Sequence, residues 1–209
     1  MKLNDRARAF IKGLTVSRQA GIADLAILAH AWLESGGFSR VIGSYNAWGV
    51  KVPKRTPWSG KVFYVPTTEY SRAIAGETAA QALPRMVKLW GQPDVKVLGL
   101  VKGMWKLGLK QGFIDFNTQG EAIAWYCDFI QRLYPLSLVS RNEPTLYFNG
   151  LVGRGPVDRP QQGRPYQVIE QIPGKLIYAT DPDYVSELLA LKNSLERDAD
   201  VKAALAAVA

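Results

Sequence analysis

The chain has 209 residues, 47% of them hydrophobic and 21% charged, which is enough apolar material for a folded core and excludes disorder as the dominant state. Its 26 basic and 18 acidic residues give a formal net charge of +8, which suits an anionic partner such as nucleic acid, a membrane or a bacterial cell-wall polymer. One cysteine and one histidine exclude an intrachain disulfide and a zinc site built from these two residue types.

The N-terminal residues MKLNDRARAFIK contain no uninterrupted apolar stretch of the kind that a secretory signal needs. No run in the sequence approaches the ~18 apolar residues of a membrane span. We therefore expect a protein that is made and kept in a cytosol until something else releases it.

Two helices are predicted in the first part of the chain. A short helix over 4–14 has an N-cap at Asn4 or Asp5. Apolar residues recur at helical spacing over 18–35, where Ser17 is a plausible cap and a glycine pair follows the last turn.

The pattern changes after this helix. Over 45–70 the segments WGVKV and KVFYV, separated by PKRTPWSG, predict two short strands that form a small β-hairpin lobe. Residues 73–134 return to helical periodicity broken by glycines, which predicts short helices and a longer one over 119–133. The Gly- and Pro-rich stretch 141–175 predicts an irregular connection, and a final helix is expected over 182–207.

Glu34 is the first candidate for chemistry. It falls in the last turn of the 18–35 helix, on the border of the apolar face. The negative end of the helix dipole and partial burial both disfavour ionisation, so we expect a raised carboxyl pKa. A protonated carboxylic acid is the proton donor that glycosidic cleavage requires. The alternative is a solvated helix-end residue.

The sequence around this residue carries several motifs in a fixed order. They are LESGG (33–37), NAWGVK (46–51), WSGK (58–61), TTEY (67–70) and YATDPDY (178–184). Together these motifs resemble glycoside hydrolase family 73, the peptidoglycan endo-β-N-acetylglucosaminidases. The resemblance covers about 22–72 and, more loosely, 176–191.

The resemblance implies roles for three residues. Glu34 is similar to the family's general acid, Glu69 falls where the family places a second carboxylate, and Tyr178 resembles an active-site tyrosine. Glu69 would either activate water as a general base or assist attack by the substrate's own acetamido group. Judged without the family, Glu69 would be a solvent-exposed carboxylate and Tyr178 a capping or core tyrosine.

Further residues are predicted to contact the substrate through aromatic stacking or hydrogen bonds. These are His30, Asn46, Trp48, Trp58, Tyr64 and Tyr70. His30 replaces the family's usual glutamine one turn before Glu34, so its imidazole can reach that carboxyl or can simply be a packed residue. Gly37 stands where a tryptophan is usual.

Two other features are weighed outside the resemblance. Lys102, Lys106 and Lys110 recur every four residues and form either a basic stripe for an anionic polymer or a solvated helix face. Cys127 lies on the apolar face of its helix and is expected to be a core residue, because no second histidine or cysteine is available to activate it.

We therefore expect an α+β fold, mainly helical and lysozyme-like, with the small β-hairpin lobe over a substrate groove. Residues 1–209 would form a single catalytic domain, with insertions relative to the family at about 73–111 and 135–175. The implied function is peptidoglycan hydrolysis by an N-acetylglucosaminidase, acting as a bacteriophage endolysin that relies on a holin-type pore. We expect a monomer that uses no metal or organic cofactor and does not bind nucleic acid.

Three alternatives stay open at this stage. The chain could be a muramidase-type enzyme or a virion-associated lysin. It could also be a basic protein that binds glycan or nucleic acid without catalysis. Release of soluble sugar fragments from purified cell walls separates the enzymes from the binding proteins.

Overall fold

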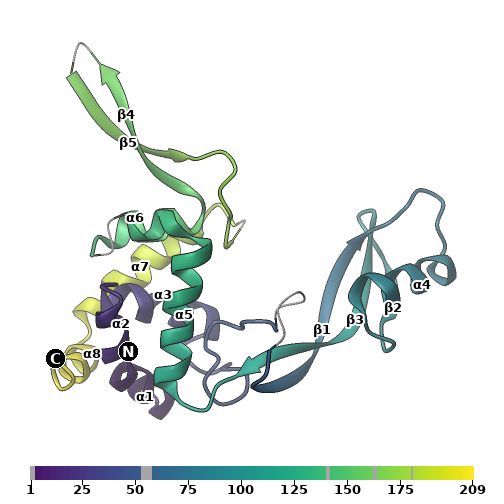
Figure 1. The fold of residues 1–209 in the computed structure, drawn as a ribbon, viewed down its shortest axis with the longest axis horizontal. Helices are drawn as coiled ribbons and strands as arrows, with labels where there is room; N and C mark the ends of the chain where they lie inside the picture. Colours follow the sequence, from purple (N-terminus) through teal and green to yellow (C-terminus); the bar gives the residue numbers. More distant parts are fainter. Residues whose placement is uncertain (1–2, 53–57, 140–141, 162–163, 180) are drawn as a thin grey trace. The chain divides into compact units, whose positions relative to one another are not determined.

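The chain forms two compact units in the computed structural model. We call them the helical unit, Met1–Gly49 with Phe116–Ala209, and the sheet unit, Val50–Asp115. The structure describes residues 3–52, 58–139, 142–161, 164–179 and 181–209. Most elements are helices, accompanied by two small antiparallel sheets (Figure 1), which confirms the predicted α+β, mainly helical class.

The helical unit begins with α1 (Asp5–Gly13), which confirms the first predicted helix. Asn4 is its cap, because the Asn4 side-chain oxygen accepts a hydrogen bond from the Ala7 N–H at 2.8 Å. This bond satisfies one of the free donors of the first turn.

The single helix predicted over 18–35 is wrong at its start. The chain instead forms α2 (Thr15–Gln19) and then α3 (Asp24–Ser35). Between them Gly21 has a φ of 70°, a left-handed conformation that interrupts the helix. Ser17 therefore lies inside α2 and does not cap α3. The end of α3 is as predicted, since Gly36 closes it with a φ of 57°.

The unit continues with α5 (Gln119–Leu133) and the 3₁₀ turn η1 (Pro135–Leu138). α5 confirms the helix predicted over 119–133, and Thr118 caps it by accepting a hydrogen bond from the Glu121 N–H at 3.1 Å.

The irregular connection predicted over 141–175 is wrong. This stretch contains α6 (Pro144–Leu151) and a hairpin of β4 (Arg154–Gln161) and β5 (Arg164–Gln171). The prolines that argued against regular structure are compatible with it here. Pro144 stands in the first turn of α6, where its missing N–H is not needed, and both strands of an isolated hairpin are edge strands, which accommodate proline.

The helix predicted over 182–207 is interrupted once. It divides into α7 (Tyr184–Arg197) and α8 (Ala199–Ala206) at Asp198, whose backbone is extended. The Asp198 carboxylate accepts hydrogen bonds from the N–H groups of Asp200 and Val201, so this residue caps the second helix.

The core of the helical unit supports the end of α3. Helix α3 packs against α6 and α7, and α5 packs against α1, α2 and η1. Large side chains with almost no solvent exposure fill the space between these helices: Phe10, Ile27, Leu28, Ile123, Tyr126, Tyr147, Phe148 and Leu188. Two of these aromatic side chains, Tyr126 and Tyr147, form hydrogen bonds next to the buried His30 of α3.

The sheet unit differs from the two-stranded lobe predicted over 45–70. It contains β1 (Lys61–Arg72), β2 (Lys96–Val101) and β3 (Met104–Asp115), in the order β1-β3-β2 with antiparallel neighbours. The segment WGVKV forms no strand and makes one bridge, from Lys51 to Phe113. The loop predicted between the two segments lies largely at 53–57, outside the described residues.

Residues 96–115 are therefore strands, and the helices predicted there are wrong. The apolar residues Trp105, Leu107 and Leu109 alternate with the period of a strand and are buried. Lys102 and Gly103 have φ of 49° and 75°, which makes the tight turn between the two strands. Within 73–134, helix is correct for α4 (Ala79–Trp90) and α5.

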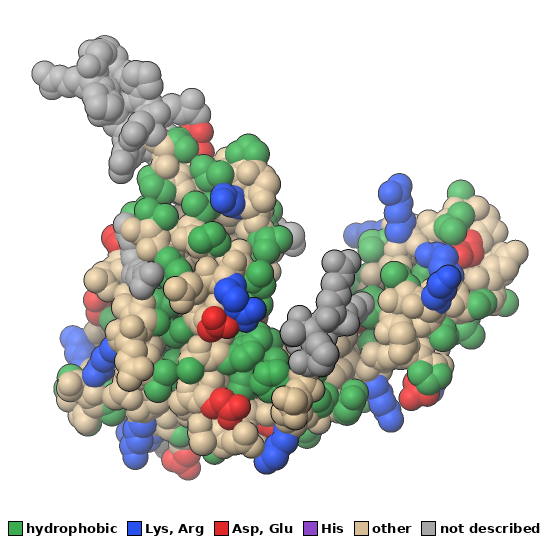
Figure 2. Space-filling model, viewed as in Figure 1, with side chains coloured by type: hydrophobic (Ala, Val, Ile, Leu, Met, Phe, Trp, Pro, Cys, Tyr) green, Lys and Arg blue, Asp and Glu red, His purple; other side chains and the backbone are tan. Residues whose placement is uncertain are grey.

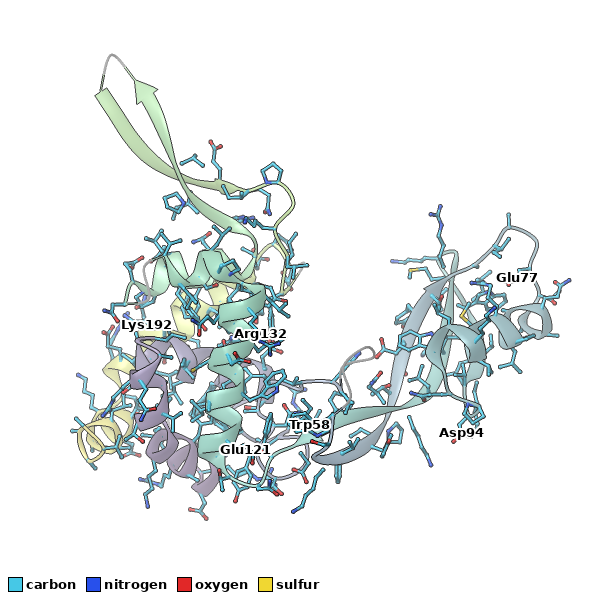
Figure 3. The ribbon with its side chains drawn as sticks, viewed as in Figure 1. Trp58, Glu77, Asp94, Glu121, Arg132 and Lys192 are labelled. Carbon is cyan, nitrogen blue, oxygen red and sulfur yellow. The ribbon has the colours of Figure 1, made fainter. Side chains whose placement is uncertain are left out.

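Helix α4 covers one face of the sheet. Their shared core contains Ala82, Met86, Val95, Trp105, Leu107 and Leu109. Glu77, labelled in Figure 3, fixes the chain ahead of the helix. Its carboxylate accepts hydrogen bonds from Arg85 Nε at 2.9 Å and from the Trp105 indole N–H at 2.8 Å. These contacts hold the pKa of the Glu77 carboxyl at about 2.

Candidate active site

Glu34 projects from the last turn of α3, and 26% of its side chain is exposed. The Tyr184 hydroxyl, from the first turn of α7, donates a hydrogen bond to Glu34 Oε1 at 2.5 Å. The Oε2 atom has no hydrogen-bond partner among the described residues. One carboxyl oxygen is thus held by the protein, and the other is available for chemistry.

His30 lies one turn before Glu34 and is completely buried. Its Nε2 is 2.7 Å from the Tyr184 hydroxyl and 3.6 Å from Glu34 Oε1. Its Nδ1 is 2.5 Å from the hydroxyl of Tyr126 on α5. The Tyr126 hydroxyl is in turn 2.8 Å from that of Tyr147 on α6. Four helices therefore contribute to one set of hydrogen bonds.

These contacts correct the predicted direction of the Glu34 pKa shift. Burial has the largest single influence and raises the pKa of this carboxyl. The hydrogen-bonding and charge interactions with the His30 imidazole, together with the hydrogen bond from Tyr184, lower it by more in total. The pKa of Glu34 therefore lies below its usual value, whereas the helix end alone predicted a raised one.

Tyr178 lies beside this set of residues. Its ring meets the His30 ring edge-on at 4.6 Å between centroids and stacks on Tyr184 at 6.1 Å. Burial and the nearby Glu34 carboxylate raise the pKa of both tyrosines, so both hydroxyls stay protonated at neutral pH.

Tyr184 contacts Glu34 directly, and sequence reasoning missed it. It is the last residue of the YATDPDY motif, whose first residue, Tyr178, was the one predicted to be an active-site tyrosine. The motif was therefore the available signal, although spacing alone does not tell which of its two tyrosines donates to the acid. Tyr126 gave no signal beyond its place in the helix predicted over 119–133, and Tyr147 falls in the stretch that was predicted to be irregular.

Three residues predicted to contact the substrate are buried instead. His30, Asn46 and Trp48 are 0%, 1% and 3% exposed. The Trp48 ring stacks on Tyr126 at 4.0 Å with the two planes 6° apart. These side chains therefore support the site from inside the protein, because no surface of them is free for a polymer.

Glu69 lies on β1 in the sheet unit, within a strand and not after one as expected. Its carboxylate accepts a hydrogen bond from Lys51 Nζ at 2.6 Å, and 21% of its side chain is exposed. Two of the motifs, NAWGVK and TTEY, thus meet in one ion pair.

Tyr64 and Tyr70 are exposed on the face of the sheet opposite α4, where they are paired across the strands with Gly112 and Lys106. Lys110 shares this face, because alternate residues of a strand point the same way. Trp58 is half-buried, and its indole N–H donates to the Lys61 carbonyl at 3.0 Å. Lys102 lies apart, in the β2–β3 turn.

The left-handed backbone at position 37 favours the glycine that stands there. Its φ is 70°, a conformation in which any side chain is strained. A Cβ at this position would lie 3.2 Å from the Trp32 indole nitrogen. The Trp32 ring, edge-on to Phe38, occupies the neighbouring space instead.

No group of three or more metal-binding side chains occurs among the described residues. Cys127 is buried, and burial raises the pKa of its thiol to about 11, which opposes a nucleophilic role. In the described part of the chain, no helix combines the length and apolar character that crossing a bilayer requires.

No protein-family model matches the sequence, and no curated protein matches it. Solved structures with a similar fold include the C-terminally truncated glycoside hydrolase domain of FlgJ from Salmonella typhimurium. That domain is 22% identical, with a TM-score of 0.54 covering 92% of this chain and 96% of the other. A mutant peptidoglycan hydrolase from Sphingomonas sp. A1 is 18% identical, with a TM-score of 0.53 and coverages of 95% and 97%.

The catalytic domain of the autolysin Auto from Listeria monocytogenes is also similar. It is 15% identical, with a TM-score of 0.52 and coverages of 98% of this chain and 90% of the other. At these identities the similarity concerns the fold, and it confirms the expected lysozyme-like class.

Proposed function

We propose that this protein hydrolyses the glycan strand of peptidoglycan, with Glu34 as the proton donor. The observation that carries the proposal is the position of this carboxyl and the hydrogen bond that it accepts. It lies at a helix end in a fold shared with glycoside and peptidoglycan hydrolases; Tyr184 holds one of its oxygens, and the other has no hydrogen-bond partner in the described part of the chain. A basic chain, at +8, also suits approach to an anionic cell wall.

The proton would leave from Oε2 of Glu34. It is transferred to the oxygen of the scissile glycosidic bond while the bond from that oxygen to the sugar's anomeric carbon breaks. Because the pKa of Glu34 is lowered in the free protein, the protonated fraction is largest at acidic pH. A bound polymer that displaces water from the exposed quarter of the side chain favours the neutral acid.

Glu69 is the second carboxylate in this proposal. It acts as a general base on water or supports attack by the substrate's acetamido group. The two routes predict different products: direct attack by water inverts the anomeric configuration, whereas the acetamido route retains it. NMR of freshly formed products distinguishes them before mutarotation.

Substrate contacts are proposed at Trp58, Tyr64 and Tyr70, whose rings can stack on the apolar faces of sugars. Tyr64 and Tyr70 share their face of the sheet with Lys106 and Lys110, whose ammonium groups can pair with carboxylates of the peptide stems. Figure 2 shows Lys and Arg side chains next to hydrophobic ones on the sheet unit. Tyr178 is proposed to orient the substrate or an intermediate from the helical unit.

The bond that is cut is proposed to be the one after N-acetylglucosamine. Borohydride reduction of the digested wall followed by mass spectrometry should then give fragments that end in reduced glucosamine. Fragments that end only in reduced muramic acid would make the protein a muramidase.

Glu34→Gln tests the proposal directly, because it keeps the shape of the side chain and removes the acidic proton. General acid catalysis typically contributes about 10²–10⁴-fold, so wall-clearing activity should fall by at least that order. Glu196→Gln is the matched control, since Glu196 is half-exposed and pairs with Lys192 on its own helix. A folded Glu34→Gln protein with near-wild-type activity would refute the mechanism, and wall binding without cleavage by the wild type would favour a non-catalytic role.

The biological role we propose is that of a bacteriophage endolysin, held in the cytosol of the host until a membrane pore opens. Expression alone in a bacterium should then leave the cells intact, and permeabilising the inner membrane should trigger lysis. Prompt lysis on expression alone would contradict this role. Association of the protein with purified virions would identify a virion-carried lysin.

A further inference from the structure

Behind Glu34, four hydrogen bonds connect five side chains, which we call the Tyr–His network. Its members, in spatial order, are Tyr147, Tyr126, His30, Tyr184 and Glu34. Three of them, Tyr147, Tyr126 and His30, have no solvent exposure at all. These three side chains are out of contact with bulk solvent, so each needs a hydrogen-bond partner within the fold.

The positions of the protons follow from counting donors. A carboxylate has only acceptors, so the single proton of the Tyr184 hydroxyl points to Glu34. The oxygen of Tyr184 must then accept from His30 Nε2, which places the proton of a neutral imidazole on Nε2.

The same count continues on the far side of the ring. With Nε2 protonated, Nδ1 of the neutral ring is an acceptor, and the Tyr126 hydroxyl donates to it. The Tyr126 oxygen is left to accept from Tyr147. All four hydrogen bonds therefore run in one direction, from Tyr147 towards the carboxylate, and bonds aligned in this way strengthen one another.

The opposite tautomer breaks the network. With the proton on Nδ1, the bare Nε2 and Glu34 Oε1 would compete for the one proton of Tyr184. One buried acceptor would lose its partner, which is costly inside a protein.

We propose that Tyr126 and Tyr147 are positioning residues that fix the proton of neutral His30 on Nε2, so that Tyr184 always donates to Glu34. Neither tyrosine can touch a substrate, since both are buried. The consequence for catalysis rests on the proposed function: the network holds Oε1 in place and leaves Oε2 as the oxygen that carries the acidic proton. Tyr178 also faces the imidazole, through ring contact, and no hydrogen bond joins it to the network among the described residues.

His30 is the only histidine in the sequence, so every imidazole nitrogen signal in an NMR spectrum of the protein comes from this residue. The protein is labelled with ¹⁵N-histidine, and the long-range proton–nitrogen spectrum is recorded at a pH where the ring is neutral. We expect the wild type to carry the proton on Nε2. A wild type with the proton on Nδ1 would overturn the proposal.

Tyr126→Phe removes the donor to Nδ1 and keeps the ring that stacks on Trp48. The preference for the Nε2 tautomer should weaken about fivefold, which corresponds to about 1 kcal/mol for one lost hydrogen bond. Tyr147→Phe should act in the same direction by less, and it serves if Tyr126→Phe fails to fold. Tyr134→Phe is the control, because the Tyr134 ring packs on Tyr178 outside the network. Loss of the Tyr134 hydroxyl should leave the tautomer of His30 unchanged.

An unchanged tautomer in folded Tyr126→Phe and Tyr147→Phe would also overturn the proposal. Steady-state kinetics adds a second readout: kcat should fall several-fold with KM unchanged, since the network acts on the acid and not on substrate binding. The two proposals fail separately. An active Glu34→Gln enzyme refutes the catalytic mechanism, whereas the tautomer of His30 tests the network whether or not the chain cleaves peptidoglycan.

Discussion

Replacing Tyr184 by phenylalanine separates the hydroxyl from the ring that carries it. The ring still stacks on Tyr178, so the packing of α7 against α3 is preserved. The substitution removes the donor to Glu34 Oε1 at 2.5 Å and the partner of His30 Nε2 at 2.7 Å. It therefore tests the hydrogen bonds of the candidate site with little change in shape.

The expected loss of stability is the sum of the contributions of these two hydrogen bonds. A hydrogen bond to a charged group contributes about 1.5–3 kcal/mol, and one between neutral groups about 1 kcal/mol. The free energy of unfolding should fall by about 2.5–4 kcal/mol at neutral pH. For a protein of this size the midpoint of thermal unfolding should drop by roughly 5–15 °C.

The pH dependence has a definite sign. The Glu34 pKa is lowered in the folded protein, partly by the Tyr184 hydrogen bond, so the charged carboxylate contributes stability above its unfolded pKa. This contribution disappears as the pH falls through the lowered folded pKa. The gap between wild type and Tyr184→Phe should therefore be largest at neutral pH and shrink in acid.

Thermal unfolding of both proteins between about pH 3 and pH 7 measures this gap, with Tyr134→Phe as the control for loss of a tyrosine hydroxyl. The alkaline limb of wall-clearing activity should also move to higher pH in Tyr184→Phe, because a weaker hold on the carboxylate raises the Glu34 pKa. A variant as stable as the wild type at neutral pH, with no change in the activity profile, would refute the assignment of the Tyr184 contact.

Further predictions concern the histidine, the sheet unit and the core. His30→Gln removes the imidazole whose contact lowers the Glu34 pKa, so the alkaline limb of activity should move to higher pH without loss of the reaction; a limb at lower pH would contradict this cause of the lowered pKa. Glu77→Gln should destabilise the sheet unit at neutral pH, and the difference should vanish as the pH falls from about 4.5 towards about 2, which amide exchange of the strands can follow. Gly150→Ala should cost about 3 kcal/mol or more, because its Cβ would lie 2.2 Å from a backbone nitrogen of η1; Gly120→Ala, with 3.5 Å to its nearest neighbour, should be almost neutral in thermal unfolding.

The sequence predicted the features that depend on neighbouring residues. The helix over 119–133 has a strong apolar period and a threonine cap, and the end of α3 is marked by Gly36, so both are correct. The wrong helices at 96–115 have a specific cause. A spacing of four, as in Lys106 and Lys110, keeps side chains on one face of a helix and also on one face of a strand, so it does not distinguish the two.

The site was predictable only in part, for a related reason. Glu34 could be located from its place at a helix end and from its motif. Its partners could not, because Tyr126 and Tyr184 are 96 and 154 residues from His30 in the sequence and meet it only in the folded helical unit. The pKa prediction failed for the same reason: the helix end is visible in the sequence, but the groups that outweigh it are not.

The β4–β5 hairpin leaves both of its edges without a neighbouring strand among the described residues, and such edges attract a strand from another molecule. Three of its positions are prolines, at 156, 160 and 165, and a proline has no N–H with which to extend a ladder of hydrogen bonds. The ribbon can therefore project from the helical unit with fewer donors for a second copy to pair with. These prolines argued against a hairpin at the level of the sequence, and in the folded protein they oppose the addition of a strand from a second copy.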